Sequence, residues 1–228
     1  MVDRRSFVGA TLLTACGAAA GNFLSLCAEE TKEEDVSPPE DLMREHGVLN
    51  RILLVYDHAS AEISAGKSFR FDALHNAATI LKSFIENYHE KQEEDYLFPR
   101  FQKAGKLVEL VHTLKSQHEV GRTLTGQILA LSAAKSLNAD ERQRLLAALH
   151  SFNRMYRPHE AREDTILFPA LRTIVSKHEF DALGEAFEKR EHELFGKEGF
   201  ESTVAKIAEI EKQLGIYDLA QFTPRASS

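Results

Sequence analysis

Two stretches of the chain carry nearly the same eleven residues, and both could supply ligands to a metal ion. They read HEKQEEDYLFP from His89 to Pro99 and HEAREDTILFP from His159 to Pro169. In each, a glutamate follows the first histidine by four residues. On a helix, side chains at this spacing lie on one face, with Cβ atoms about 5–6 Å apart. Imidazole and carboxylate groups bind iron, manganese and zinc, so the repeat predicts half of a metal site written twice.

The chain from residue 40 onward has the apolar spacing of amphipathic helices and almost no strand pattern. Apolar residues recur at steps of three and four in four long segments, with breaks near Gly66, Gly105 and Asn138. Asn138 and Glu141 predict a cap for the fourth segment. The sequence therefore predicts an all-α fold, an up-down antiparallel four-helix bundle with extra C-terminal helices. The Leu-Phe-Pro endings predict a helix end or kink, because proline lacks the N–H that continues a helix.

Each predicted bundle helix has a histidine in its apolar stripe, and two also have a glutamate one turn later. An unpaired buried carboxylate costs several kcal/mol, and metal coordination would remove this penalty for all six groups. The first two histidines are 43 residues apart (46 to 89) and the last two 41 apart (118 to 159). Two equivalent half-sites are therefore expected, with two metal ions bridged by the glutamates. The predicted ligands are His46, His89, Glu93, His118, His159 and Glu163.

The order H…HxxxE…H…HxxxE, the sequence REHGVLNRIL around His46 and both Leu-Phe-Pro endings resemble the hemerythrin-like, or HHE cation-binding, domain. The resemblance covers roughly residues 41–172. It implies a non-haem centre of two iron ions with an oxo or hydroxo bridge, four terminal histidines, and Glu93 and Glu163 as bridging ligands; manganese or zinc is the weaker alternative. Respiratory hemerythrins have a fifth histidine four residues after the one on the third helix. This chain has Arg122 there, and family members with the poorer ligand set lean towards sensing, iron handling or chemistry with peroxide and nitric oxide.

Three functions fit this expectation. One is a protein that binds O2, NO or peroxide for sensing, scavenging or delivery. Another is an enzyme, a di-iron oxidoreductase that is peroxidase-like or NO-reducing. The third is an iron store or a structural metal site. A sealed apolar lining would favour binding, whereas an open channel or a nearby proton donor would favour turnover.

Several polar residues near the predicted ligands have more ordinary expected roles. Glu90 and Glu160, each directly after a ligand histidine, are expected to face solvent or to hydrogen-bond around the site. Of the neighbouring acidic run, only Glu93 has the ligand register, and the rest is expected to form a solvated face. Tyr56 and Tyr156 are expected as core aromatics, with a role beside the pocket as the alternative.

The overall composition excludes several classes of function. The formal net charge is −7, and no stretch is rich in lysine and arginine, which excludes a nucleic-acid partner. Both cysteines, Cys16 and Cys27, lie in the first 30 residues. A thiolate metal site or a disulfide framework in the rest of the chain is therefore excluded.

The first residues predict export. Arg4 and Arg5 precede an apolar run from Phe7 to Ala15, which resembles a twin-arginine signal peptide. The sequence LTAC ending at Cys16 resembles a lipobox, so a lipid anchor there would be the only membrane contact. A plain signal peptide cleaved near Ala28 and a chance apolar start are the alternatives. We therefore expect a periplasmic or cell-envelope protein. The predicted divisions are a signal peptide over 1–28, a polar linker over 29–40, the bundle over 41–174 and a helical extension over 175–228.

Overall fold

The computed structural model describes residues 36–134, 136–196 and 199–224. The predicted export signal, the lipobox at Cys16 and most of the predicted linker lie outside the described residues. Within the described ranges, no helix is both long enough and apolar enough to cross a bilayer.

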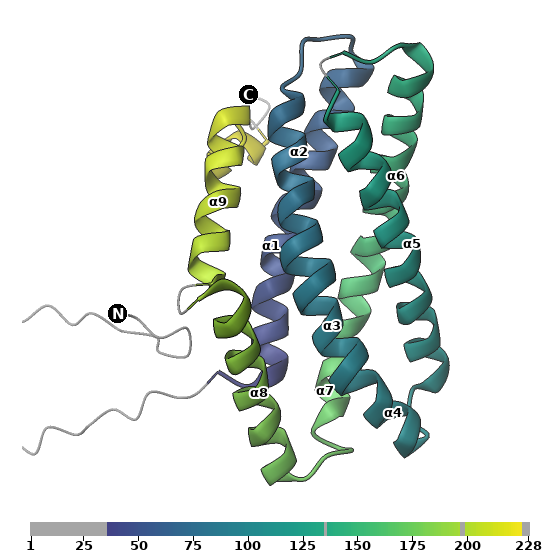
Figure 1. Cartoon of the computed structure of the whole chain (residues 1–228), viewed down its shortest axis with the longest axis vertical. Helices are drawn as coiled ribbons and strands as arrows, with labels where there is room; N and C mark the ends of the chain where they lie inside the picture. The colour runs from purple at the N-terminus through teal and green to yellow at the C-terminus, as the bar shows by residue number, and fades with distance from the viewer. Residues whose placement is uncertain (1–35, 135, 197–198, 225–228) are drawn as a thin grey trace, which may run out of the picture.

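Four long helical rods form an antiparallel bundle (Figure 1). The first rod is α1 (Pro38–Ser64) and the third is α5 (Val108–Ser132). The second rod consists of α2 (Phe71–Ile80), η1 (Leu81–His89), α3 (Glu90–Gln92), η2 (Glu93–Leu97) and α4 (Phe98–Ala104). The fourth consists of α6 (Ala139–Arg162), η3 (Glu163–Leu167) and α7 (Phe168–Leu171). The chain runs up, down, up and down through the four rods, which confirms the predicted all-α bundle.

Local capping sets where the rods begin and end. Ser37 and Glu40 form a capping box before α1, so this helix begins at Pro38, three residues before the predicted start of the bundle. Asn138 and Glu141 form the predicted capping box before α6, with both hydrogen bonds 2.9 Å long. Gly105 ends the second rod in the left-handed conformation (φ 63°), which glycine adopts without steric cost.

The two Leu-Phe-Pro sequences do not end their helices. Both rods continue through the proline, and a π-helical turn precedes it: η2 in the second rod and η3 in the fourth. Proline cannot donate the N–H that continues an α-helix, so each rod lacks one α-helical hydrogen bond just after its π turn. Both π turns begin at a predicted bridging glutamate, Glu93 or Glu163. The repeat in sequence is therefore also a repeat in backbone geometry.

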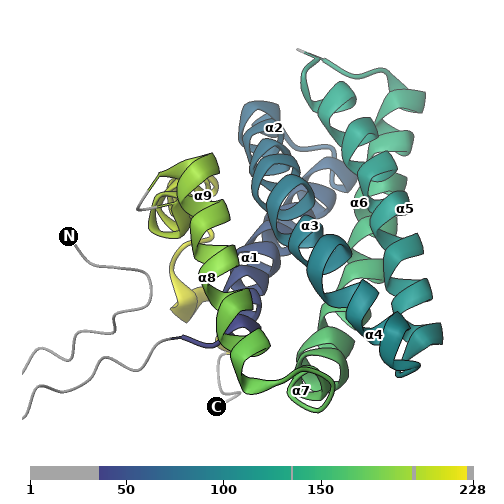
Figure 2. The same cartoon turned by 60° about the horizontal axis from the view of Figure 1, so that its bottom comes forward.

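Two further helices flank the bundle on one side. These are α8 (Lys177–Phe195) and α9 (Gly199–Leu214), followed by the 3-10 turn η4 (Leu219–Phe222). They pack against α1, and α9 also against α2, on the side away from α5 and α6 (Figure 2). Phe187 and Ile207 bury their side chains there, and Arg51 on α1 forms an ion pair with Glu211. The predicted C-terminal helices are thus present, and they cover a side of the bundle.

The apolar core falls into two clusters separated along the bundle axis. One lies towards the end of the bundle where α1 connects to α2 and includes Ile52, Leu74 and Leu149. The other, hereafter the lower cluster, includes Leu42, Leu97, Phe98, Leu114 and Phe168. In all four rods the predicted ligands fall between residues of the two clusters in sequence. The polar level is therefore enclosed by apolar packing above and below.

Candidate metal centre

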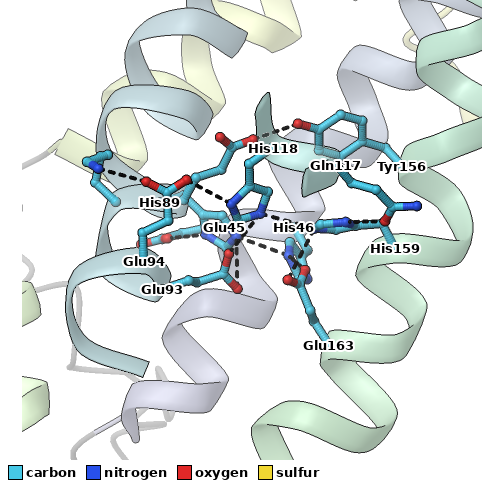
Figure 3. A network of polar contacts seen from close by, with 12 residues as sticks. Glu45, His46, His89, Glu93, Glu94, Gln117, His118, Tyr156, His159 and Glu163 are labelled. Atoms are coloured by element: carbon cyan, nitrogen blue, oxygen red, sulfur yellow. Dashed lines mark hydrogen bonds and ion pairs between the residues drawn. The ribbon is translucent and has the colours of Figure 1, made fainter. Parts of the chain in front are cut away.

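All six predicted ligands meet at this level, and none of their side chains is more than 3% exposed (Figure 3). They form two groups whose ligand atoms are mutually within 4.8 Å: His46 with His89 and Glu93, and His118 with His159 and Glu163. We call the histidine pair His46 and His89 the first half-site and the pair His118 and His159 the second half-site.

The histidine nitrogens converge at distances that suit a shared ion. The Nε2 atoms of His46 and His89 are 3.0 Å apart, and those of His118 and His159 are 3.2 Å apart. Two imidazole nitrogens at about 2.1 Å from one ion would be about 3.0 Å apart in adjacent octahedral positions and about 3.4 Å apart in a tetrahedron. Both pairs fit this range.

Each predicted bridging glutamate faces both half-sites. Oε1 of Glu93 lies 3.9 Å from His89 Nε2, and its Oε2 lies 3.4 Å from His118 Nε2. Glu163 mirrors this arrangement: its Oε1 lies 3.1 Å from His159 Nε2 and its Oε2 lies 3.4 Å from His46 Nε2. One oxygen towards each half-site is the placement that a bridging carboxylate requires.

The four oxygens of Glu93 and Glu163 are buried and have no hydrogen-bond partner among the described residues. Buried polar atoms in proteins are nearly always satisfied, so such a set calls for a missing partner. An N–H···N bond within each histidine pair would account for the close nitrogens but would leave these oxygens unsatisfied. Two cations would satisfy nitrogens and oxygens together. The donor set, imidazole and carboxylate without thiolate, fits iron, manganese or zinc.

The residue after each glutamate orients a histidine on the facing rod. Glu94 Oε1 accepts from Nδ1 of His118 at 3.1 Å, and Asp164 Oδ1 accepts from Nδ1 of His46 at 2.7 Å. A hydrogen bond at Nδ1 leaves Nε2 for the metal and raises its basicity. The expected solvated role was therefore wrong for Glu94, which is largely buried.

The residue before each histidine on the first and third rods orients the other two ligands. Glu45 Oε2 accepts from Nδ1 of His89 at 2.7 Å, and Gln117 Oε1 accepts from Nδ1 of His159 at 2.9 Å. Sequence reasoning missed all four of these orienting residues. The signal was present, because they flank the ligands at matching places in the two halves of the chain.

The phenylalanines of Leu-Phe-Pro also serve the site. Phe98 stacks on His118 with ring centroids 5.6 Å apart, and Phe168 stacks on His46 at 5.5 Å. Each ring belongs to the lower cluster and closes that side of the polar level. Each eleven-residue copy thus supplies a predicted ligand, a predicted bridge, an acceptor for a histidine on the facing rod and an aromatic ring against that same histidine.

Arg122 occupies the position of the fifth histidine of the oxygen carriers, and its guanidinium is engaged with carboxylates. Its Nη2 donates to Glu90 at 2.8 Å and to Glu94 at 2.6 Å. Tyr156, whose ring packs near that of His159, donates its hydroxyl to Glu90 Oε1 at 2.6 Å. Glu90 is therefore a buried hydrogen-bonding partner near the site, one of its two expected roles, and Tyr156 lies beside the centre.

In the other half of the chain, the side chain that donates to the equivalent glutamate is a neutral amide and not a guanidinium. Glu160 is also buried and accepts from Nδ2 of Asn50 at 2.8 Å. Asn50 follows His46 by four residues, as Arg122 follows His118. Tyr56 is a fully buried core aromatic whose ring meets Phe152 edge-on.

Burial and close charges shift the pKa values of the ligand histidines in opposite directions. Burial alone would lower the pKa of His46, but the hydrogen bond to Asp164 and the nearby charge of Glu163 raise it to about 10. Burial lowers the pKa of His118 to about 4, and it also lowers the pKa of His89. In the metal-free protein His46 is therefore protonated at neutral pH, and a metal ion must displace that proton.

The two bridging carboxyls also behave differently. Burial and the charge of Glu163 raise the pKa of Glu93 well above its usual range. Burial opposes ionisation of Glu163 as well, but His159 and His46 hold its pKa well below its usual range. Metal binding would therefore release a proton from Glu93 too, and affinity should fall as the pH is lowered.

Comparison with known proteins agrees with this geometry. The sequence profile described as "Hemerythrin HHE cation binding domain" matches residues 37–149 and again 109–226. Uncharacterised proteins of Mycobacterium bovis and of two Mycobacterium tuberculosis strains are each 45% identical to the chain over 222 residues, which is 96% of this chain and 87% of theirs. No solved structure matches. The chain belongs to the hemerythrin HHE cation-binding domain family, with a metal-binding helical domain whose histidine and glutamate clusters could hold metal ions.

Proposed function

We propose that the chain is a non-haem two-iron protein that binds O2, or a related small molecule such as NO or peroxide, for sensing, scavenging or delivery. The observation that carries this proposal is the set of four unsatisfied oxygens of Glu93 and Glu163 between two converging histidine pairs. The resemblance to hemerythrin-like domains favours iron over manganese and zinc. Two adjacent iron ions supply electrons that imidazole and carboxylate side chains cannot supply.

The surroundings of the site support a small ligand. Phe98 and Phe168 cover the ligand histidines from the lower cluster, and all six ligands are buried. A small uncharged molecule gives up little hydration at such a buried centre, whereas a large or charged substrate would lose its hydration without replacement contacts. The apolar cover also excludes water, which protects a bound ligand from unwanted proton transfer.

A second candidate is a di-iron oxidoreductase, peroxidase-like or NO-reducing. The observation in its favour is the hydroxyl of Tyr156, which lies beside the second half-site and donates to the buried carboxyl of Glu90. Burial raises the pKa of Glu90 to about 8, so this carboxyl can hold a proton at neutral pH. A proton donor near a bound small molecule permits turnover.

The deciding experiment is to purify the protein without air, count its metal and follow its optical spectrum while O2 is admitted and then removed. Two irons per chain with an absorption band that appears and disappears would support reversible binding. Two irons with a band that decays to a stable oxidised spectrum would support the oxidoreductase. Zinc alone, or no metal, would refute the two-iron function and leave a structural site.

Matched variants on α5 test the ligand assignment. His118→Ala should lower the metal content, because His118 is a buried ligand of the second half-site. His112→Ala, which changes an exposed histidine of the same helix, should leave it unchanged. Full metal occupancy in His118→Ala would contradict the assignment.

We also propose that the protein is exported by the twin-arginine route to the cell envelope and anchored by lipid at Cys16. The sequence features in support are Arg4, Arg5 and the LTAC sequence. Cell fractionation of the full chain and of Cys16→Ser tests this, and a cytoplasmic full chain would contradict it.

A further inference from the structure

The two half-sites have the same ligands but different charges around them. We infer that the first half-site binds its metal ion more tightly than the second and fills first. The inference rests on the proposed two-metal centre and concerns the residues that surround the ligands. Three differences between equivalent positions support it, and each makes the surroundings of the first half-site more negative than those of the second.

The first difference is that a carboxylate orients a histidine of the first half-site, whereas an amide orients the equivalent histidine of the second. Glu45 accepts from Nδ1 of His89, and Gln117 accepts from Nδ1 of His159 at the equivalent place. The two side chains are nearly equal in shape, so the difference is one of charge. A carboxylate acceptor makes the imidazole a stronger donor to a cation than an amide does. Glu45 is fully buried, so water screens its charge little.

The second difference concerns the acceptors that follow the bridging glutamates. Glu94, which holds His118, also accepts from Lys91 Nζ at 2.7 Å and from Arg122 Nη2 at 2.6 Å. Asp164, which holds His46, has no ion pair with lysine or arginine among the described residues. Asp164 is 34% exposed, so solvent screens part of its charge. Two cations nevertheless offset Glu94, and none offsets Asp164.

The third difference is that the second half-site has a nearby cation where the first has a neutral amide. Arg122 stands four residues after His118, and Asn50 stands four residues after His46. Each donates to the buried glutamate that follows a ligand histidine: Arg122 to Glu90, and Asn50 to Glu160. A fixed guanidinium near the second half-site opposes the entry of a metal cation there. The first half-site has no charge at the equivalent position.

The test is a stepwise titration of metal-free protein with Co²⁺ without air, followed by optical absorption. Changing one of these orienting residues typically changes metal affinity about 10–100-fold, so the wild type should bind two ions in two steps at least about 10-fold apart. Glu45→Gln gives the first half-site the acceptor of the second and should weaken the first step by about 10-fold or more. Gln117→Glu does the reverse and should strengthen the second step while leaving the first unchanged.

Equal half-sites would give the opposite pattern. Glu45→Gln would then leave the first step unchanged and weaken the second, and Gln117→Glu would strengthen the first step. That result refutes the inference and leaves the two-metal centre intact, whereas failure of the wild type to bind Co²⁺ refutes the centre itself. If Glu45→Gln does not fold, Gln117→Glu alone tests the inference. This variant should fold, because glutamate and glutamine have nearly the same shape.

Discussion

Replacing Glu93 by methionine should stabilise the metal-free protein. The Glu93 side chain is fully buried, its two oxygens lack hydrogen-bond partners, and burial together with Glu163 raises its pKa. A buried carboxyl without a hydrogen-bond partner costs about 1–3 kcal/mol, and methionine, which has a similar volume, removes that cost. For a domain of this size, 1 kcal/mol shifts Tm by about 2–4 °C. We therefore expect metal-free Glu93→Met to unfold about 2–12 °C above the metal-free wild type.

The same substitution should abolish most of the response to metal. At a free metal concentration 100-fold above Kd, each occupied site adds about 2.7 kcal/mol of stability. The wild type should gain this amount at both half-sites, whereas Glu93→Met lacks an oxygen ligand at each. Thermal unfolding followed by circular dichroism, with and without Co²⁺ and without air, measures both effects.

Glu86 offers a matched control on the same rod. It is also buried, its Oε1 lacks a hydrogen-bond partner, and burial raises its pKa, but it is not a predicted ligand. Its Oε2 forms an ion pair with Lys82 at 3.8 Å, so Glu86→Met need not stabilise the protein, but it should keep the full metal response. The reasoning would be refuted if Glu93→Met were less stable than the wild type without metal, or kept the full response with it.

Two further predictions concern the region around Tyr156. Gly121→Ala should destabilise the protein by about 1–3 kcal/mol, because a Cβ there would overlap the Tyr156 hydroxyl and lie 2.8 Å from its ring carbon Cζ. Gly126→Ala on the same helix, where nothing lies within 4 Å, should stabilise it by about 0.5–1 kcal/mol; urea denaturation of both variants checks the pair, and equal signs would contradict it. The buried carboxyl of Glu90 should lower metal-free stability as the pH rises from 4.5 through 8, because burial raises its pKa from 4.5 to about 8 and its ionisation then costs a few kcal/mol. Glu160, whose pKa rises to about 7, acts in the same direction and His118, whose pKa falls to about 4, in the opposite one, so the measurement is the difference between the wild type and Glu90→Gln. The variant should gain stability relative to the wild type over this pH range, and a difference that does not change with pH would contradict the assignment to Glu90.

The rods and the meeting of the six predicted ligands were predictable because local signals agree with one another. The periodic apolar residues place His46 and His118 on the same faces as the core, and the cap at Asn138 fixes the start of the fourth rod. Groups that share a face in all four rods must meet when those faces pack. The convergence of the six predicted ligands therefore follows from helical register.

The orienting residues were not predictable in the same way, because their roles depend on contacts between rods. Glu94 lies one residue beyond a ligand, and its partner His118 is on a different rod. The hydrogen bonds of Arg122 likewise depend on Glu90 and Glu94, which lie on a different rod. The π turns that begin at the predicted bridging glutamates depart from regular α-helical winding, which the apolar periodicity does not indicate.

The contacts between rods also explain why the eleven-residue sequence occurs twice. The second rod supplies Glu94 and Phe98 to His118, and the fourth supplies Asp164 and Phe168 to His46. Each copy therefore completes a histidine that belongs to the other half of the chain. A single copy would leave one of these histidines without its acceptor and its aromatic cover, and both half-sites with one predicted bridge in place of two, so the two copies must be present together. Charge differs only where the halves are not repeated, as at Arg122, and such positions can distinguish two metal ions held by identical ligands.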